Sequence, residues 1–361
     1  MKTILFSMPM QIGESFNDRL KNYKDDQYPG HYFFGAPELE KIGHKMIYRN
    51  PENPTKNKDA FSVFKNLLKY TFIIIRDSKS IDLIYSPYPN FLDFIIFLRS
   101  IKIFTKKIVI YQQNTIIKKK GFISYYVRQK LYYKGVDRLI FLDKKTASDS
   151  IKTGLVTKNQ VFVGNWGPDV EQYKRILDKS EKTEGSKDVK FISTGKDSRD
   201  FDLMFDAFCG LNAKFEFYLT DSDLADKFKN KSSNIDVYYL EESKESPQIA
   251  LKATINSDVS IIICKPTRPT SNGYTALCEA MGLGKPVILT ENQYMPIDVE
   301  KEGFGITVPV GDVVALRKAI NTFCNNPELV KEYSKNARKY AERQYNSIIL
   351  GKQLDTLFQN L

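Results

Sequence analysis

Short apolar runs alternate along the chain with longer amphipathic segments, an arrangement typical of α/β domains built on parallel sheets. In the first half, the apolar runs predict strands at residues 3–7, 45–48, 81–85, 107–111, 137–142 and 160–163. The segments between them predict helices at residues 61–76, 90–101, 123–134 and 144–152.

Turn-forming residues then interrupt the series at 164–169, and the polar stretch 180–188 suits a linker or an exposed loop. The pattern restarts with predicted strands at residues 189–193, 215–219, 236–239, 259–264, 286–289 and 305–308. Helices are predicted at residues 201–209, 247–255, 272–281, 313–325 and, as one long final helix, 331–358. The two halves are similar in architecture, without a sequence repeat.

A chain of 361 residues exceeds one ordinary core, so we expect two domains. We predict an N-terminal domain over residues 1–165, a C-terminal domain over 166–340, and a helix over 341–361 that packs back on the N-terminal domain. Open parallel sheets bind ligands at the carboxyl ends of their strands. Two such domains facing each other would form an interdomain cleft.

Composition indicates a globular protein, with 42% hydrophobic and 27% charged residues. No stretch approaches the roughly 18 apolar residues of a membrane span. The opening segment MKTILFSMPM has only a short apolar run, followed by Gln11 and Glu14, so we interpret it as a strand rather than a signal peptide. The four cysteines have no paired spacing, which favours a reducing cytoplasm.

The net charge of +11 is unevenly distributed along the chain. Residues 1–165 contain 28 Lys and Arg against 14 Asp and Glu, whereas residues 166–361 contain 26 against 29. A basic half can bind nucleic acid, an anionic membrane surface or an anionic substrate, and it can also be a solvated basic surface.

The strongest candidate for chemistry is a strand, loop, helix, turn and strand unit over residues 259–290. Ser271 or Asn272 can cap its helix, Gly273 allows close backbone approach, and the first turn offers N–H groups to a diphosphate. The helix dipole contributes only about 0.3–1 kcal/mol at an exposed site, so a nearby cation such as Lys265 or Arg268 is needed.

Asn272, Thr275 or Ala276, and Glu279 fall on one face of this helix, and Glu279 lies roughly 10 Å from the helix start. A carboxylate at that distance can accept hydrogen bonds from the two vicinal hydroxyls of a ribose. On periodicity alone, an ordinary helix with a partly exposed glutamate explains the pattern equally well.

This unit resembles the donor-binding signature of nucleotide-sugar glycosyltransferases, particularly glycosyltransferase family four, the glycosyl transferases group 1. Residues 195–202 resemble the family's basic phosphate-binding segment, 303–316 its closing segment, and 163–169 its interdomain junction. The likeness covers most of the second half, and the first half is similar only at 29–31 and 43–44. It implies an α/β GT-B fold, with two Rossmann-like domains facing a cleft.

By this resemblance, Lys196 and Arg199 bind the donor diphosphate, Glu279 the ribose, and Asn272, Gly273 and Tyr274 the phosphates and sugar. The predicted donor-binding set is Gly195, Lys196, Arg199, Lys265, Arg268, Ser271, Asn272, Gly273, Tyr274, Thr275 and Glu279. The family usually has two glutamates eight positions apart, and Ser271 stands at the first of these positions. This departure leaves the donor sugar and the mechanism open.

Acid–base candidates are few, because the chain has only two histidines. We interpret His44, just before a strand, as structural, and predict His31 and Glu14 as the catalytic candidates. Gln113 and Asn114 follow the fourth strand, where related enzymes often carry a histidine; these amides can contact the acceptor or sugar but cannot act as a base. Retention would need no strong base if the leaving phosphate assisted.

Asp221, Ser222 and Asp223 resemble the metal-binding triplet of GT-A glycosyltransferases, but they follow a strand of a different architecture. We interpret the triplet as a decoy and expect neither a metal nor a cofactor, because no histidine or cysteine cluster is present and the nucleotide sugar is a substrate.

Residues 118–134 combine lysines with aromatic side chains on a predicted helix, which favours contact with an anionic membrane. We expect no nucleic-acid partner, since no recognised nucleic-acid motif is present. The sequence therefore predicts a cytoplasmic, peripherally membrane-associated glycosyltransferase. It would transfer a sugar from a UDP or GDP donor to a glycan or lipid-linked acceptor, with retention, in surface polysaccharide or glycoconjugate synthesis. A non-catalytic GT-B-like nucleotide-binding protein and a basic nucleic-acid-binding protein are the alternatives.

Overall fold

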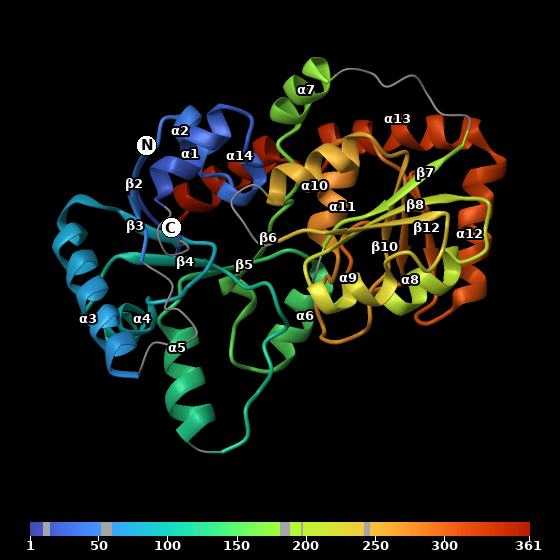
Figure 1. Cartoon of the computed structure of the whole chain (residues 1–361). Helices are drawn as coiled ribbons and strands as arrows, with labels where there is room; N and C mark the ends of the chain where they lie inside the picture. The colour runs from blue at the N-terminus through green and yellow to red at the C-terminus, as the bar shows by residue number, and fades with distance from the viewer. Residues whose placement is uncertain (10–14, 52–59, 122, 181–187, 196–197, 242–245) are drawn as a thin grey trace. The chain divides into compact units, whose positions relative to one another are not determined.

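The computed structural model describes the whole chain except residues 10–14, 52–59, 122, 181–187, 196–197 and 242–245 (Figure 1). Contacts divide the chain into two compact units. Unit 1 consists of Met1–Asp25, Phe33–Asn165 and Ile348–Leu361, and unit 2 of Asp26–Tyr32 and Trp166–Ser347. Compared with the predicted ranges, residues 26–32 and 341–347 group with the second unit.

Unit 1 is built on a six-stranded parallel sheet with the order β2-β1-β3-β4-β5-β6. Its strands are β1 (Thr3–Ser7), β2 (Lys45–Arg49), β3 (Leu83–Ser86), β4 (Lys107–Tyr111), β5 (Arg138–Phe141) and β6 (Val161–Val163). Ile4 of β1 pairs with Leu83 of β3, so the strand order reverses between these two strands. The central strands are buried on both faces, which explains their continuous apolar sequences.

Helices cover both faces of this sheet. They are α1 (Phe16–Lys24), α2 (Ala36–Ile42), α3 (Ala60–Asp77), α4 (Asp93–Ser100), α5 (Lys130–Lys134) and α6 (Lys144–Lys152), with a π-helical stretch at Ile123–Gln129. The chain returns to unit 1 in α14 (Ser347–Gln359), where Phe358 packs against Tyr85 of β3 at a ring distance of 5.4 Å. None of the helices in the described parts of the chain has both the length and the apolarity needed to cross a membrane.

His44 has the structural role predicted for it. Its Nδ1 accepts a hydrogen bond from the Lys2 amide at 3.1 Å, and its Nε2 lies 2.9 Å from Asp355 Oδ1 on α14. An acceptor at Nδ1 leaves the proton on Nε2, so the imidazole donates to the carboxylate. This hydrogen bond lowers the pKa of Asp355 below its ordinary value.

Unit 2 has a second six-stranded parallel sheet, ordered β12-β11-β10-β7-β8-β9. Its strands are β7 (Lys190–Ser193), β8 (Lys214–Leu219), β9 (Ile235–Tyr239), β10 (Val259–Ile262), β11 (Val287–Thr290) and β12 (Gly305–Val308). This is the doubly wound order of a Rossmann sheet, with its reversal between β7 and β10. Phenylalanines dominate the core, and the rings of Phe208 and Phe215 stack at 4.1 Å.

The helices of unit 2 are α7 (Val170–Lys179), α8 (Phe201–Phe208), α9 (Ser222–Phe228), α10 (Ser246–Ile255), α11 (Tyr274–Gly282), α12 (Val313–Asn325) and α13 (Pro327–Arg343). Asp221 caps α9 by accepting a hydrogen bond from the Leu224 amide at 3.1 Å, which gives the acidic triplet a local structural role.

The prediction of one final helix over 331–358 is wrong, because the chain breaks between α13 and α14. Buried Asn346 lies in this break, and its side-chain amide donates to the carbonyls of Ala341 and Glu342. The amide thereby satisfies carbonyls that the end of α13 leaves unpaired.

Candidate functional site

Two loops meet where the strand order of unit 2 reverses, the position at which doubly wound sheets bind ligands. One loop follows β7 and the other follows β10. The Asp200 amide donates to the Ile263 carbonyl at 2.9 Å, and the Lys265 amide donates to the Ser198 carbonyl at 2.7 Å. A hydrogen bond of 2.7 Å between the hydroxyls of Ser198 and Thr267 adds a third link. These three hydrogen bonds therefore hold the two loops together at the carboxyl ends of β7 and β10.

Arg199 lies at the centre of this junction and is 8% exposed. Its Nη1 donates to Cys264 Sγ at 3.0 Å. A methyl group at Gly195 would lie 2.7 Å from Arg199 Nη2, and one at Gly273 would lie 3.6 Å from Nη1. Both glycines have positive φ, +121° and +88°. The guanidinium thus lies close to the backbones of two glycines. A side chain at either glycine position would occupy the space that the guanidinium fills.

Helix α11 begins at Tyr274 with Gly273 as its N-cap, and no side chain caps it. The predicted capping by Ser271 or Asn272 is therefore wrong. The Ser271 carbonyl instead accepts from the Tyr274 amide at 3.1 Å, closing a tight turn at left-handed Gly273. An uncapped first turn leaves backbone N–H groups for a ligand, and the adjacent guanidinium adds positive charge. This arrangement is suited to an anion.

Glu279 lies on α11 about 7.5 Å further along the axis, five residues after Tyr274. Its side chain is 24% exposed. The Tyr32 hydroxyl donates to Glu279 Oε1 at 3.1 Å, and His31 Nε2 lies 3.7 Å from the same oxygen. Burial, with Glu279 adding to it, raises the pKa of Tyr32 well above its ordinary value, so the hydroxyl stays protonated and donates.

His31 does not fit the predicted role of acid–base catalyst. The residue is 1% exposed, and both ring nitrogens are buried without a hydrogen-bond partner among the described residues. The ring packs edge-on against Trp166 and Tyr173. A general base must reach the proton it removes, and neither nitrogen of this ring is exposed in the structure.

Tyr274 is also buried, and its hydroxyl donates to the Trp166 carbonyl. Its side chain therefore holds α11 in the core, and its amide donates to the Ser271 carbonyl. Lys265 has a half-exposed side chain whose Nζ lies 3.6 Å from Asp200 Oδ1. The other predicted donor residues differ in exposure: Arg268 is exposed, Asn272 and Thr275 are partly buried, and Ser271 is buried.

The remaining predicted residues lie elsewhere. Glu14 and Lys196 are outside the described residues. Gln113 and Asn114 belong to unit 1, where they follow β4. The Asn114 carbonyl accepts a hydrogen bond from Gln112 Nε2 at 2.7 Å, which folds this loop onto itself. The acceptor and sugar contacts predicted for the two amides stay predictions.

Sequence reasoning missed Tyr32, Trp166 and Gln172 as part of the surroundings of Glu279. Trp166 Nε1 donates to the His31 carbonyl at 2.9 Å, and Gln172 hydrogen-bonds the backbone of Tyr28 and Gly30. The only sequence signal was the turn-forming Pro29-Gly30 pair followed by aromatic residues.

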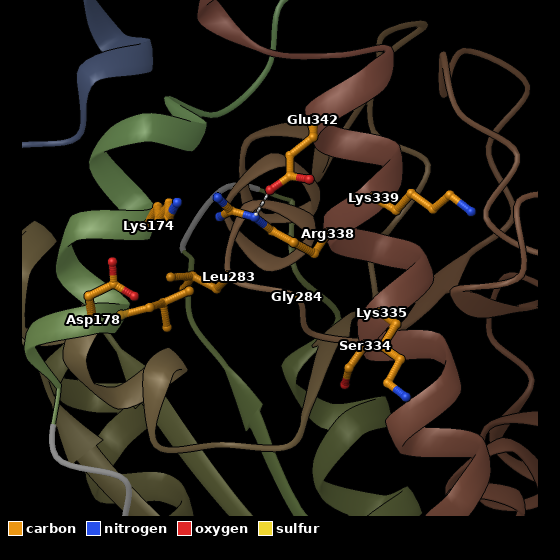
Figure 2. Close-up of a pocket in the computed structure, with 10 residues that line it drawn as sticks. Lys174, Asp178, Leu283, Gly284, Ser334, Lys335, Arg338, Lys339 and Glu342 are labelled. Atoms are coloured by element: carbon orange, nitrogen blue, oxygen red, sulfur yellow. Dashed lines mark hydrogen bonds and ion pairs between the residues drawn. The ribbon is translucent and has the colours of Figure 1, made fainter.

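A hollow of about 530 Å³ lies at the opposite end of α11, between α7 and α13 (Figure 2). Arg338 fills part of it and donates to the carbonyls of Gly282 and Val170, while pairing with Glu342 at 2.7 Å. These contacts hold the C-terminal end of α11, so we assign Arg338 a structural role. No group of acidic, histidine or cysteine side chains suited to a metal occurs among the residues that the structure describes.

Residues 260–340 match the family Glycosyl transferases group 1. Three solved structures are similar over nearly the whole length of both chains. HepE from Anabaena in complex with UDP-glucose is 14% identical, covers 100% of both chains and has a TM-score of 0.65. A glycosyltransferase from Rickettsia africae is 13% identical, with coverage of 99% and 98% and a TM-score of 0.66.

The third structure is WaaG, a glycosyltransferase involved in lipopolysaccharide biosynthesis, which is 14% identical, with coverage of 99% and 100% and a TM-score of 0.59. A sequence comparison with curated proteins gives no match. At these identities the structural likeness shows the fold, and the family match covers the loop after β10, α11, β11, β12, α12 and most of α13. Together they show a GT-B fold whose residues 260–340 resemble the glycosyl transferases of group 1.

Proposed function

We propose that the protein transfers a sugar from a UDP or GDP donor to a glycan or lipid-linked acceptor at an anionic membrane surface. In this proposal the diphosphate binds between Arg199 and the first turn of α11, and the ribose binds at Glu279. The observation that carries it is the position of a buried guanidinium beside an uncapped helix start, with a carboxylate further along the same helix.

We extend the proposal to the chemistry. The bond from the sugar's anomeric carbon to the phosphate oxygen breaks, and the acceptor oxygen bonds to the same face of that carbon. The acceptor proton passes to the leaving phosphate, so no enzymic base is needed. Arg199 and the helix amides stabilise the charge that develops on the diphosphate. Burial of His31 supports this assignment, since it removes the predicted histidine base.

Calorimetric titration with UDP and GDP tests the donor site, with Glu279→Gln as the variant and Glu332→Gln as the control. Glu332 is an exposed glutamate on α13 of the same unit. Hydrogen bonds to a charged group contribute about 1.5–3 kcal/mol, so Glu279→Gln should weaken nucleotide binding about ten- to hundredfold. The control should bind as the native protein does. Equal affinity in both variants would refute the ribose assignment.

Unit 1 carries the observation that supports membrane association. Among the described residues, the five exposed phenylalanines all lie on α3 and α4: Phe61, Phe64, Phe72, Phe94 and Phe97. Phe61 is 75% and Phe72 70% exposed. Within each helix these residues share one face at helical spacing, and the two helices lie side by side (Figure 1). Exposed apolar patches of this kind mark interaction sites.

The charge around this face supports an anionic bilayer as the proposed partner. Residues 60–134, which contain α3, α4 and α5, have 14 Lys and Arg against 3 Asp. Their net charge equals the +11 of the whole chain. Aromatic side chains bordered by lysines suit the boundary between lipid headgroups and acyl chains, and each lysine near an anionic surface contributes about 1 kcal/mol.

Vesicle flotation tests the membrane face, with Phe61, Phe64 and Phe72 replaced by serine together. The matched control replaces the exposed unit 2 residues Ile249, Val310 and Val314 by serine. Burying a phenylalanine contributes about 1.5–3 kcal/mol, so the phenylalanine variant should lose about 100-fold or more in binding to vesicles containing phosphatidylglycerol. The control should float as before. Equal flotation of the two variants would exclude α3 as the docking face.

A further inference from the structure

A short segment from the N-terminal part of the chain belongs to the donor unit. Residues Asp26–Tyr32 lie between α1 and α2 in sequence, yet they group with unit 2. The side chain of Gln172 on α7 is 0% exposed, and both the nitrogen and the oxygen of its amide group form hydrogen bonds with this segment. Its Nε2 donates to the Tyr28 carbonyl, and its Oε1 accepts from the Gly30 amide, each at 2.8 Å. We name Asp26–Tyr32 the strap.

Both ends of the strap are also fixed. Asp26 pairs with Arg175 at 2.9 Å and with Lys179 at 2.8 Å, both on α7. Burial alone would raise the pKa of Asp26, but the hydrogen bonds from Lys179 and Arg175 outweigh it and lower the pKa. At the other end, the His31 carbonyl accepts from Trp166 Nε1 at 2.9 Å. These contacts place Tyr32 at α11 through a series of specific hydrogen bonds.

The strap ends at the carboxylate that we assign to the ribose. The Tyr32 hydroxyl donates to Glu279 Oε1, and the buried His31 ring lies against the same oxygen. A carboxylate has about four lone-pair positions, so one bond from Tyr32 leaves Oε2 and part of Oε1 to accept from two hydroxyls. A glutamate side chain held in one rotamer also loses less entropy when a ligand binds.

We propose that Tyr32 is a positioning residue that holds Glu279 in the orientation that recognises both ribose hydroxyls, and that the strap exists to place it. The proposal rests on the proposed function of this site as a nucleotide-sugar site. Tyr32 itself acts through Glu279 and need not contact the ribose.

Tyr32→Phe tests this proposal, because it keeps the ring and removes only the hydroxyl. The matched control is Tyr218→Phe, which removes a tyrosine hydroxyl donated to Glu216 on β8 of the same unit. Binding constants are measured by calorimetry for UDP, GDP and the 2′-deoxy form of each. Thermal unfolding without nucleotide shows whether each variant is folded.

For the nucleotide that binds more tightly, the native protein should prefer the ribose form to the 2′-deoxy form by about tenfold or more. Tyr32→Phe should weaken binding of the ribose form about three- to tenfold and leave the 2′-deoxy form nearly unchanged, so that the preference falls by about the same three- to tenfold. Tyr218→Phe should leave both constants unchanged.

The outcomes separate the two proposals. If the native protein binds neither nucleotide, or does not distinguish ribose from deoxyribose, the proposed donor site at Glu279 fails and the role of Tyr32 fails with it. If the native protein shows the preference and Tyr32→Phe keeps it, only the role of Tyr32 is excluded. A loss of affinity that is equal for both sugar forms would show a merely structural role for the strap and would also overturn the proposal.

Discussion

The two units are built on the same kind of sheet and differ in what surrounds it. In unit 2 the order reverses between β7 and β10, where glycine backbones lie close to a buried arginine at the proposed anion site. In unit 1 the order reverses between β1 and β3, and the distinctive feature is the exposed apolar face of α3 and α4. The comparison shows that a shared parallel sheet fixes where loops and helices lie, while their side chains decide what each unit binds.

Charge follows the same division. The excess of lysine and arginine lies in residues 60–134, all of them in unit 1, whereas residues 166–361 are slightly acidic. In our proposal an anionic donor binds in the less basic unit, through a local arrangement of one guanidinium and a helix start. Net charge supports the proposed membrane partner, and local geometry supports the proposed nucleotide site.

The largest effect should follow from replacing Gly273 by alanine, which tests whether nucleotide binding resides in unit 2 alone. The new methyl group would lie 2.6 Å from Ile262 Cγ2, at a φ of +88°. Left-handed strain of about 1–2 kcal/mol and overpacking of about 1–3 kcal/mol should lower the free energy of unfolding by about 2–5 kcal/mol. Displacement of the helix start should raise the Kd for nucleotide about 100-fold or more, as measured by calorimetry.

Gly311→Ala is the matched control, because Gly311 has a φ of +75° and open space around it. It should cost about 1 kcal/mol of stability and leave nucleotide binding unchanged. Vesicle flotation should be normal in both variants. If Gly273→Ala bound nucleotide normally, the site could not lie at the start of α11.

Replacing Lys118, Lys119 and Lys120 by alanine should have the next largest effect. These exposed residues precede the π-helical stretch of unit 1. At about 1 kcal/mol each, their loss should weaken binding to anionic vesicles about 100-fold at low salt, with a smaller loss at high salt. The matched control removes Lys331, Lys335 and Lys339, three exposed lysines on α13 of unit 2. Equal losses would mean that net charge, rather than a face of unit 1, attracts the membrane.

The sheets could be predicted almost completely from sequence, because most strands among the described residues are apolar runs between turn signals. Four helices were missed. Helices α1 (Phe16–Lys24) and α7 (Val170–Lys179) are short and strongly polar, and α2 (Ala36–Ile42) and α9 (Ser222–Phe228) have only seven residues each. Such segments give little periodic signal, since tertiary contacts rather than their own pattern stabilise them.

The start of α11 could be located from sequence, but the conformation that makes it a site could not. The left-handed φ of Gly273 is what removes the predicted side-chain cap. The strap was unpredictable for a different reason. Tyr32 and Glu279 are 247 residues apart, and Gly30 and Gln172 are 142 apart. Hydrogen bonds between such distant positions follow from the packed fold and leave no local pattern in the sequence.

The smallest expected effect is a difference in stability between variants of two aspartates that occupy equivalent positions in the two sheets. Asp137 precedes β5 of unit 1 and accepts from the Ile108 amide at 2.9 Å, and Asp258 precedes β10 of unit 2 and accepts from the Lys190 amide at 2.8 Å. Of these two aspartates, Asp137 also forms an ion pair with Arg99, at 2.8 Å. Burial alone would raise the pKa of Asp137, but hydrogen bonds, with that from Arg99 the strongest, outweigh it and lower the pKa below 3.8.

Asp137→Asn should therefore lower the free energy of unfolding by about 2–3 kcal/mol at pH 7, and Asp258→Asn by about 1 kcal/mol or less. Because the pKa of Asp137 is lower in the folded state, its contribution is fully present above the ordinary value of 3.8 and is lost as pH falls through the folded pKa. The difference between the native protein and Asp137→Asn should then shrink in acid.

Trp166, the single tryptophan, is buried in unit 2, so its fluorescence during urea unfolding reports that unit, whereas circular dichroism reports both. If the units unfold separately, Asp137→Asn should move the circular dichroism transition to lower urea while the fluorescence transition stays in place. If they unfold together, both transitions should move equally. An unchanged circular dichroism transition would show that the Arg99 pair does not stabilise unit 1.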